Sequence, residues 1–130
     1  MPLQPGDVVR LFDNLATPPK WKRFVCVSPE DGWFMRINSE PRHDARRNVQ
    51  LPRKGNECCL EHDSYLDLYS ILEFDDSVVD DSLQMPANDL GPLSKESLYE
   101  LINATRSAVT LTPEQQEKVC GNLAARAEEA

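Results

Sequence analysis

The sequence predicts a mainly β domain, a small barrel or sandwich, followed by two C-terminal helices. Five or six short apolar segments, separated by turn residues, lie within the first 74 residues. Closely spaced strands without helices between them are typical of small barrels and sandwiches. Beyond residue 90 the apolar residues recur at the three- and four-residue spacing of amphipathic helices.

Three segments carry the clearest strand pattern. Residues 6–12 alternate after a Pro-Gly start, residues 23–28 form a nearly continuous apolar run, and residues 33–39 follow the turn from Pro29 to Gly32. The second and third segments are separated by a turn of hairpin length, so we expect them to pair as an antiparallel hairpin. Shorter strands are predicted over residues 48–51, 64–68 and 70–74.

The whole chain, residues 1–130, is expected to form a single domain, because this length suits one hydrophobic core. Residues 1–74 would form the β-barrel and residues 91–128 the C-terminal helices. Between them, residues 75–90 are acidic and lack aromatic side chains, which predicts a mobile linker or an extended insertion. Ser94 is suited to cap the first helix, and Thr112, Pro113 and Gln115 are suited to begin the second.

Composition excludes several classes of protein. The chain is 40% hydrophobic and 28% charged, as globular proteins are. No apolar run approaches the roughly 20 residues that a membrane-spanning helix needs. The N-terminus lacks a basic region followed by an apolar stretch, so a cytoplasmic protein without a membrane partner is expected.

The four cysteines are expected to be reduced thiols. Cys58 and Cys59 are adjacent, which is poor geometry for a disulfide between them, and no CxxC pair occurs. A zinc site made of Cys58, Cys59, His62 and His43 is the alternative. The spacing of these residues fits no standard ligand pattern, so we expect no metal and no cofactor.

Charge is unevenly distributed along the chain, whose formal net charge is −8. Nine Lys and Arg residues lie between Lys20 and Lys54, whereas residues 57–89 contain none. One interpretation is two solvated faces of opposite sign. The other is a basic site for a polyanion in the first half of the chain, since a local field can act despite an acidic total.

Five segments resemble, in order, those of the PemK/MazF family of toxin endoribonucleases. They are GDVV at residues 6–9, KRFVCVS at 22–28, MRINS at 35–39, SYLDL at 64–68 and GPLSKESL at 91–98. The resemblance covers most of residues 4–110. It implies an SH3-like small β-barrel with a C-terminal helix, usually assembled as a homodimer. It also implies metal-independent cleavage of single-stranded RNA through the neighbouring 2′-hydroxyl, and a partner antitoxin protein that blocks the site.

The resemblance implies roles for Arg23 and Ser39, and the residues near them in sequence suggest further members of the site. Arg23 would contact the scissile phosphate, for which a planar guanidinium is suited. Ser39 would stabilise the transition state with its hydroxyl. His43, in the basic loop after Ser39, could act as a base or acid near neutral pH. The predicted substrate-binding residues are Trp21, Lys22, Arg36, Asn38 and Arg42, with Trp21 available to stack on a base. His62, beside Asp63, ranks below His43, because neighbours in a strand point to opposite faces.

Each of these residues also has an ordinary interpretation. Arg23 could be a solvated cation on a strand, Ser39 a turn residue and His43 a loop histidine. Phe24 follows Arg23 where the family commonly has proline, and Asn38-Ser39 replaces its pair of hydroxyl residues. The alternative is therefore a catalytically inactive barrel that binds protein or nucleic acid. A third possibility is that only a small-barrel fold is shared, because fold does not fix function.

Overall fold

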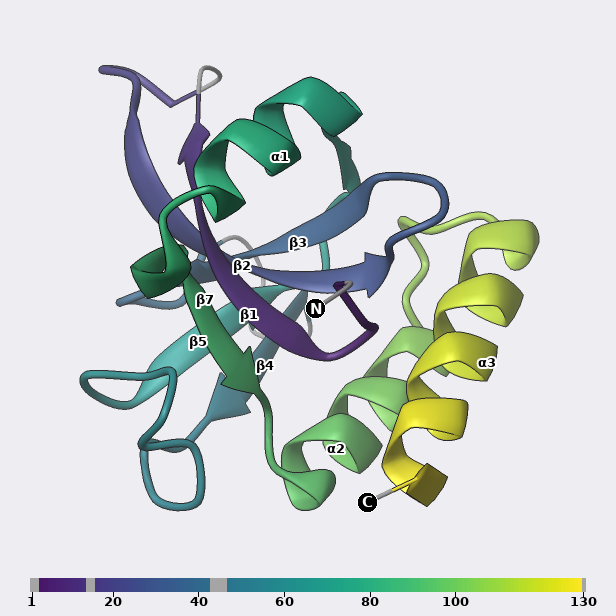
Figure 1. Cartoon of the computed structure of the whole chain (residues 1–130). Helices are drawn as coiled ribbons and strands as arrows, with labels where there is room; N and C mark the ends of the chain where they lie inside the picture. Colours follow the sequence, from purple (N-terminus) through teal and green to yellow (C-terminus); the bar gives the residue numbers. More distant parts are fainter. Residues whose placement is uncertain (1–2, 14–15, 43–46, 130) are drawn as a thin grey trace.

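The fold is mainly antiparallel sheet, with helices on both of its faces (Figure 1). A computed structural model describes residues 3–13, 16–42 and 47–129. The strands are β1 (Asp7–Asp13), β2 (Lys20–Ser28), β3 (Trp33–Asn38), β4 (Asn48–Leu51), β5 (Ser64–Asp67), β6 (Leu72–Glu73) and β7 (Asp89–Pro92). The helices are α1 (Asp76–Leu83), the 3-10 helix η2 (Pro86–Asn88), α2 (Lys95–Arg106) and α3 (Pro113–Glu129).

The strands form one curled sheet, a half-barrel. Their order is β4-β5-β3-β2-β1-β7, and β6 pairs with β3 beside this path. All of these pairings are antiparallel. Because β3 pairs with β2 along part of its length and with β5 near its end, it joins the two halves of the curl (Figure 1).

The predicted hairpin of the second and third strands is confirmed. Phe24 pairs with Arg36 and Val25 with Met35, and the register shifts near Ser28. Gly32 closes the turn with a φ of 70°, a conformation that glycine adopts without strain. Its carbonyl accepts a 2.9 Å hydrogen bond from the backbone N–H of Phe74, which attaches the turn to the start of the acidic segment.

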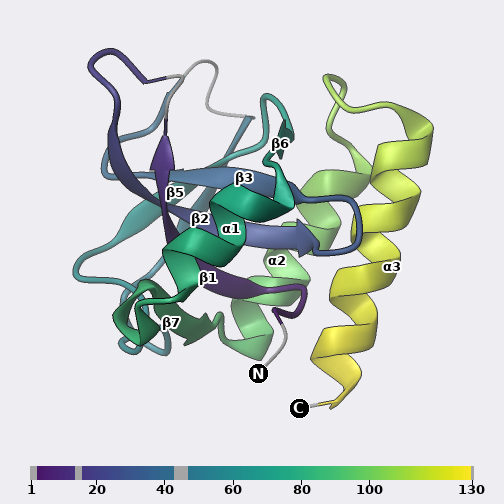
Figure 2. The same ribbon diagram turned by 45° about the horizontal axis from the view of Figure 1, so that its top comes forward.

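Two apolar clusters lie on opposite faces of the sheet. On one face, Val25 and Met35 join the core that also contains the buried residues of α2 and α3. On the other, Phe24 and Phe34 pack edge-to-face with Phe74, in a cluster that includes Val79 of α1. Figure 2 shows α1 lying across this face of the sheet. Burial on both faces explains why residues 24–27 form a continuous apolar run rather than an alternating one.

The acidic segment differs from the expected linker or insertion, because it contains regular structure. Residues 76–83 form α1, and β7 adds to the edge of β1. Val79 and Leu83 pack against the cluster around Phe24. Asn88, which is 6% exposed, donates a 2.7 Å hydrogen bond to the carbonyl of Ser82. The apolar face of α1, the pairing of β7 and the Asn88 bond together hold this segment against the sheet, while its carboxylates are exposed.

The two predicted C-terminal helices are confirmed, together with their caps. The hydroxyl of Ser94 accepts a 3.2 Å hydrogen bond from the N–H of Ser97. Thr112 and Gln115 exchange hydrogen bonds of 3.0 and 3.1 Å, which is a capping box. Of the helices in the described ranges, none has the length and apolar character to cross a membrane.

Candidate functional site

The predicted site residues gather where β2 begins and β3 ends, around two adjoining hollows. The larger, about 550 Å³, is called the basic pocket here, and the smaller, about 210 Å³, the arginine–serine hollow. The basic pocket is lined by Ala16, Thr17, Lys20, Lys22, Arg36, Asn38, Arg42 and Asp67. The arginine–serine hollow is lined by Lys20, Trp21, Lys22, Arg23, Ile37, Asn38, Ser39, His62 and Ser64.

The two hollows lie on either side of the hairpin end. Since Phe24 faces Arg36 in the register, Lys22 and Asn38 share one face, and Arg23 and Ile37 share the other. Ser39, one residue beyond Asn38, follows the face of Arg23 by the same alternation. The predicted catalytic pair and most of the predicted binding residues therefore belong to opposite faces. They remain neighbours because Lys20, Lys22 and Asn38 line both hollows.

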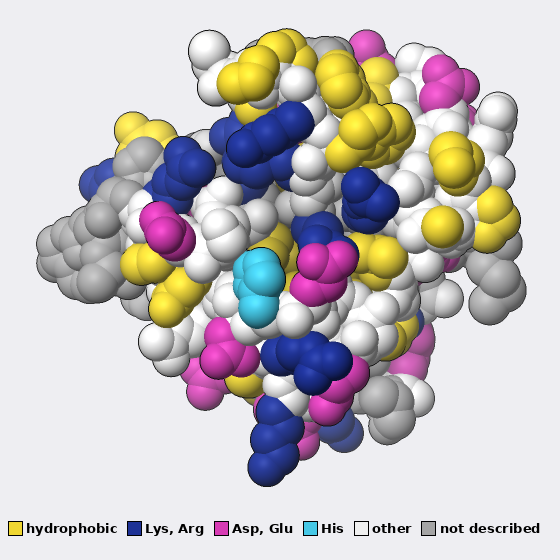
Figure 3. All heavy atoms as spheres, turned by 90° about the vertical axis from the view of Figure 1, so that its left-hand side faces the viewer, with side chains coloured by type: hydrophobic (Ala, Val, Ile, Leu, Met, Phe, Trp, Pro, Cys, Tyr) yellow, Lys and Arg dark blue, Asp and Glu magenta, His cyan; other side chains and the backbone are white. Residues whose placement is uncertain are grey.

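This side of the molecule is rich in charge. Figure 3 shows Lys and Arg side chains spread over the surface and lying beside acidic side chains. Basic and acidic residues that are separated along the sequence therefore lie beside one another on this surface. A cationic site on it is local rather than part of a broad basic face.

Arg23 is only loosely held. One of its terminal nitrogens lies 3.1 Å from a carboxylate oxygen of Glu61, whose side chain is 75% exposed. Such a pair at the surface contributes little and exchanges readily. The buried Nε atom of Arg23 has no hydrogen-bond partner within the described ranges. The guanidinium therefore has capacity to bind an oxyanion.

Arg36 is held more firmly. It donates hydrogen bonds of 2.8 and 3.2 Å to the two carboxylate oxygens of Asp13, whose side chain is fully buried. This two-pronged contact orients Arg36 and offsets much of its charge. Arg36 therefore lines the basic pocket as a residue already paired with Asp13, and it does not supply a free cation for a ligand.

Lys22 and Asn38 bridge the two hollows. Lys22 Nζ lies 3.3 Å from Asn38 Oδ1. Burial lowers the pKa of Lys22, and the neighbouring charges of Arg42 and Arg36 lower it further. Asn38 is 6% exposed, and its amide Nδ2 finds no hydrogen-bond partner in the described part of the chain. An anion bound here would relieve the crowding of positive charge and satisfy this amide.

The remaining predicted site residues are Trp21, Arg42 and His43. Trp21 is 46% exposed, and its ring meets that of Phe12 edge-on at 5.7 Å between centroids. Arg42 lines the basic pocket, where its backbone N–H donates a 2.9 Å hydrogen bond to Asn48. His43 lies outside the described residues.

Compared with protein-family models and with curated proteins, the chain matches none. Its function is therefore argued from the geometry of the site.

His62 is the residue that sequence reasoning underrated. It lies in the turn before β5, not within a strand, and it lines the arginine–serine hollow. Its Nδ1 is 2.9 Å from the backbone carbonyl of Asp63, and not in contact with that residue's carboxylate, which accepts from the N–H of Arg53. Donation from Nδ1 leaves the lone pair of Nε2 to accept a proton. No local sequence pattern placed His62 there, because the turn reaches the hollow only through the pairing of β5 with β3.

Another groove, of about 580 Å³, runs between β4, β5 and α2. It contains none of the predicted site residues, and Glu96 and Glu100 line it. Like charges would repel a polyanion from this groove.

All four cysteines are free thiols. Across residues 3–13, 16–42 and 47–129, no group of three or more His, Cys, Asp or Glu side chains is arranged to hold a metal ion. The zinc alternative also included His43, which lies beyond these ranges.

Proposed function

We propose that this protein is a metal-independent endoribonuclease of the PemK/MazF type, which cleaves single-stranded RNA through the 2′-hydroxyl next to the scissile phosphate. The observation that most supports this function is that the two residues paired by the resemblance line the same hollow. Arg23 and Ser39, which the sequence resemblance pairs, line one hollow together with a histidine. A substrate that carries its own nucleophile needs only groups that move protons and donors that stabilise the phosphorane.

Arg23 would bind the scissile phosphate. To do so its guanidinium exchanges an exposed carboxylate, that of Glu61, for two phosphate oxygens, which match its planar fork better. The Nε of Arg23, which has no hydrogen-bond partner in the part of the chain that the structure describes, would donate to the same charged group. The hydroxyl of Ser39 completes a set of donors for the extra negative charge of the transition state.

Proton transfer would fall to His62 and Lys22. The imidazole accepts the proton of the 2′-hydroxyl at Nε2, because its Nδ1 is engaged by the Asp63 carbonyl. Lys22, whose pKa burial lowers, releases a proton more readily than an ordinary lysine and would protonate the leaving 5′-oxygen. Trp21 would offer its exposed face to a neighbouring base.

The test is a cleavage assay with a single-stranded RNA in the presence of EDTA. We expect products ending in a 2′,3′-cyclic phosphate, and no cleavage where the scissile nucleotide lacks its 2′-hydroxyl. Arg23→Ala and His62→Ala should each lower the rate by roughly 10²-fold or more. Arg53→Ala removes an exposed arginine that lines neither hollow, and it should cleave normally. Cleavage that survives Arg23→Ala would contradict the assignment.

The second candidate is a catalytically inactive barrel that binds nucleic acid or protein. The ion pair of Arg23 with Glu61 favours it, because an arginine already paired is a weaker phosphate ligand. Intact RNA in the assay, with salt-dependent binding that weakens in Lys22→Ala, would identify this function.

The finer features that the resemblance implies belong to the same proposal. They are a closed SH3-like barrel, a homodimer, an antitoxin partner and a cytoplasmic location. Light scattering of the purified chain tests the dimer. Growth arrest on expression, relieved by co-expression of a neighbouring gene, tests the toxin–antitoxin pairing.

A further inference from the structure

Adjacent cysteines lie in a tight turn behind β7, and a buried asparagine holds that turn in place. Asn56 is fully buried, and its Nδ2 donates to the carbonyl of Pro52 at 2.8 Å and to Ser97 Oγ at 2.9 Å. Its Oδ1 accepts from the N–H of Ser94 at 2.7 Å, and its carbonyl accepts from the N–H of Cys59 at 3.0 Å. These bonds attach the turn to the start of α2, so the positions of the thiols are fixed before any ligand arrives.

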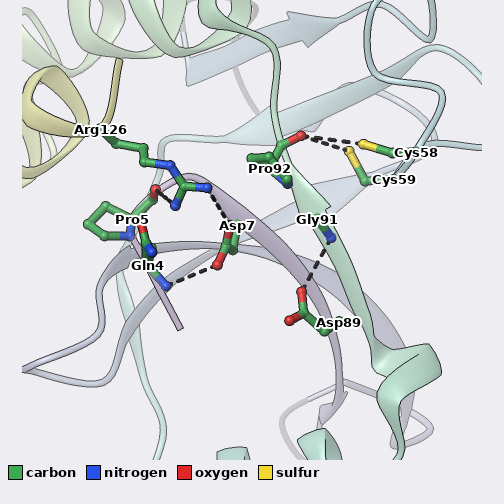
Figure 4. Close-up of polar contacts among 9 residues, drawn as sticks. All are labelled: Gln4, Pro5, Asp7, Cys58, Cys59, Asp89, Gly91, Pro92 and Arg126. Carbon is green, nitrogen blue, oxygen red and sulfur yellow. Dashed lines mark hydrogen bonds and ion pairs between the residues drawn. The ribbon is translucent and has the colours of Figure 1, made fainter. Parts of the chain in front are cut away.

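The two thiols converge on one point. Cys58 Sγ lies 3.4 Å and Cys59 Sγ 3.9 Å from the carbonyl oxygen of Pro92, and Figure 4 shows both sulfur atoms directed toward it. Burial, together with the neighbouring thiol of Cys58, raises the pKa of Cys59 to about 12. Cys58 is exposed and Cys59 is buried, which makes the pair accessible from one side.

A disulfide between them is disfavoured by covalent geometry. The peptide bond that joins them is trans. The Cα atoms of residues joined by a trans peptide are about 3.8 Å apart, whereas a disulfide spans about 4.4–6.8 Å. An atom inserted between the sulfurs lengthens the bridge and removes this conflict. The arrangement therefore suits a shared ligand better than mutual oxidation.

We propose that Cys58 and Cys59 form a two-sulfur binding site for a soft, thiophilic metalloid ion, of which trivalent arsenic is the representative. Thiolate ligands select soft ions.

With phenylarsine oxide as the probe, the step is balanced and involves no oxidation. Two As–S bonds form and the As–O bond breaks. The oxygen leaves as water with the two thiol protons.

The experiment uses intact-mass measurement of the full chain after treatment with phenylarsine oxide, followed by competition with thiols. We expect one adduct on the wild type, with two thiols protected from a thiol-modifying dye. Glutathione should not displace it, whereas 2,3-dimercaptopropanol should. Chelation makes the second As–S bond intramolecular in the wild type. Glutathione should therefore release the arsenical from Cys58→Ser at a concentration roughly 10²-fold or more below that needed for the wild type.

Cys120→Ser is the matched control, since Cys120 is a half-buried thiol on α3 away from this turn. It should keep the resistant adduct. Cys58 is exposed, so its variant is expected to fold, and circular dichroism checks this. The proposal is overturned if Cys58→Ser holds the arsenical as tightly as the wild type. It is equally overturned if glutathione strips the wild-type adduct as easily as the variant's.

Discussion

Asn56 joins two parts of the chain that are far apart in sequence, and its removal should destabilise the fold strongly. The side chain of this fully buried residue makes three hydrogen bonds, with Pro52, Ser97 and Ser94 at 2.8, 2.9 and 2.7 Å. Asn56→Ala removes all three and leaves the buried Ser97 hydroxyl and the half-buried N–H of Ser94 without these partners.

The magnitude follows from those contacts. A hydrogen bond contributes about 1 kcal/mol net, and a buried group left unsatisfied costs about 1–3 kcal/mol. Since water can reach the partly buried carbonyl of Pro52, we take the lower end for each bond. Asn56→Ala should then lower the free energy of unfolding by about 3 kcal/mol.

Urea unfolding followed by circular dichroism measures this change. Asn103→Ala is the matched control, because Asn103 is exposed on α2, where alanine is the better helix former. It should leave stability unchanged or slightly raised. A loss below about 1 kcal/mol in Asn56→Ala would refute the reasoning, since it would mean that the turn and α2 are not held through this amide.

Further predictions concern backbone conformation, burial and capping. A Cβ at Gly32 would lie 2.5 Å from the backbone oxygen of Phe74 at a positive φ, so Gly32→Ala should lower the thermal midpoint markedly. At Gly121 nothing lies within 4 Å of the new atom, so Gly121→Ala should instead stabilise α3 by about 0.5–1 kcal/mol in urea unfolding. Burial raises the pKa of Asp7 above 3.8, so the folded protein binds a proton more tightly than the unfolded chain. Stability should therefore fall as the pH rises through the window just above 3.8, and Asp7→Asn should flatten the pH profile of the unfolding midpoint. Ser94→Ala removes the cap of α2 and should cost about 1 kcal/mol, measured by the same unfolding assay; no change would mean that the cap contributes nothing.

Local patterns were sufficient for most of the fold. The Gly32 turn between two apolar runs predicts the hairpin, and the Ser94 and Thr112 signals predict where the helices begin, because turns and caps depend on residues within a few positions of each other. The acidic segment was misjudged for the same reason. Val79 and Leu83 form a helix face only because the phenylalanine cluster on the sheet covers them, and that cluster is assembled from distant strands.

The residues of the candidate site also divide into those found from the sequence and those that only the structure placed. Arg23 and Ser39 were paired through the family resemblance, and the register of the hairpin, in which Phe24 pairs with Arg36, then places Arg23 and Ile37 on one face. The pairing of β5 with β3 decided two further features. It brings Glu61 into an ion pair with Arg23, and it places His62 in the hollow.

By itself, then, the sequence determined the hairpin, the helix starts, the basic stretch and the adjacency of Cys58 and Cys59. Tertiary structure alone decided that Asp13 orients Arg36, that both thiols face Pro92 and that Asn38 Nδ2 has no hydrogen-bond partner among the described residues. The physical reason is range: conformational preferences act over a few residues, whereas burial and hydrogen bonding join residues whose separation along the chain carries no pattern.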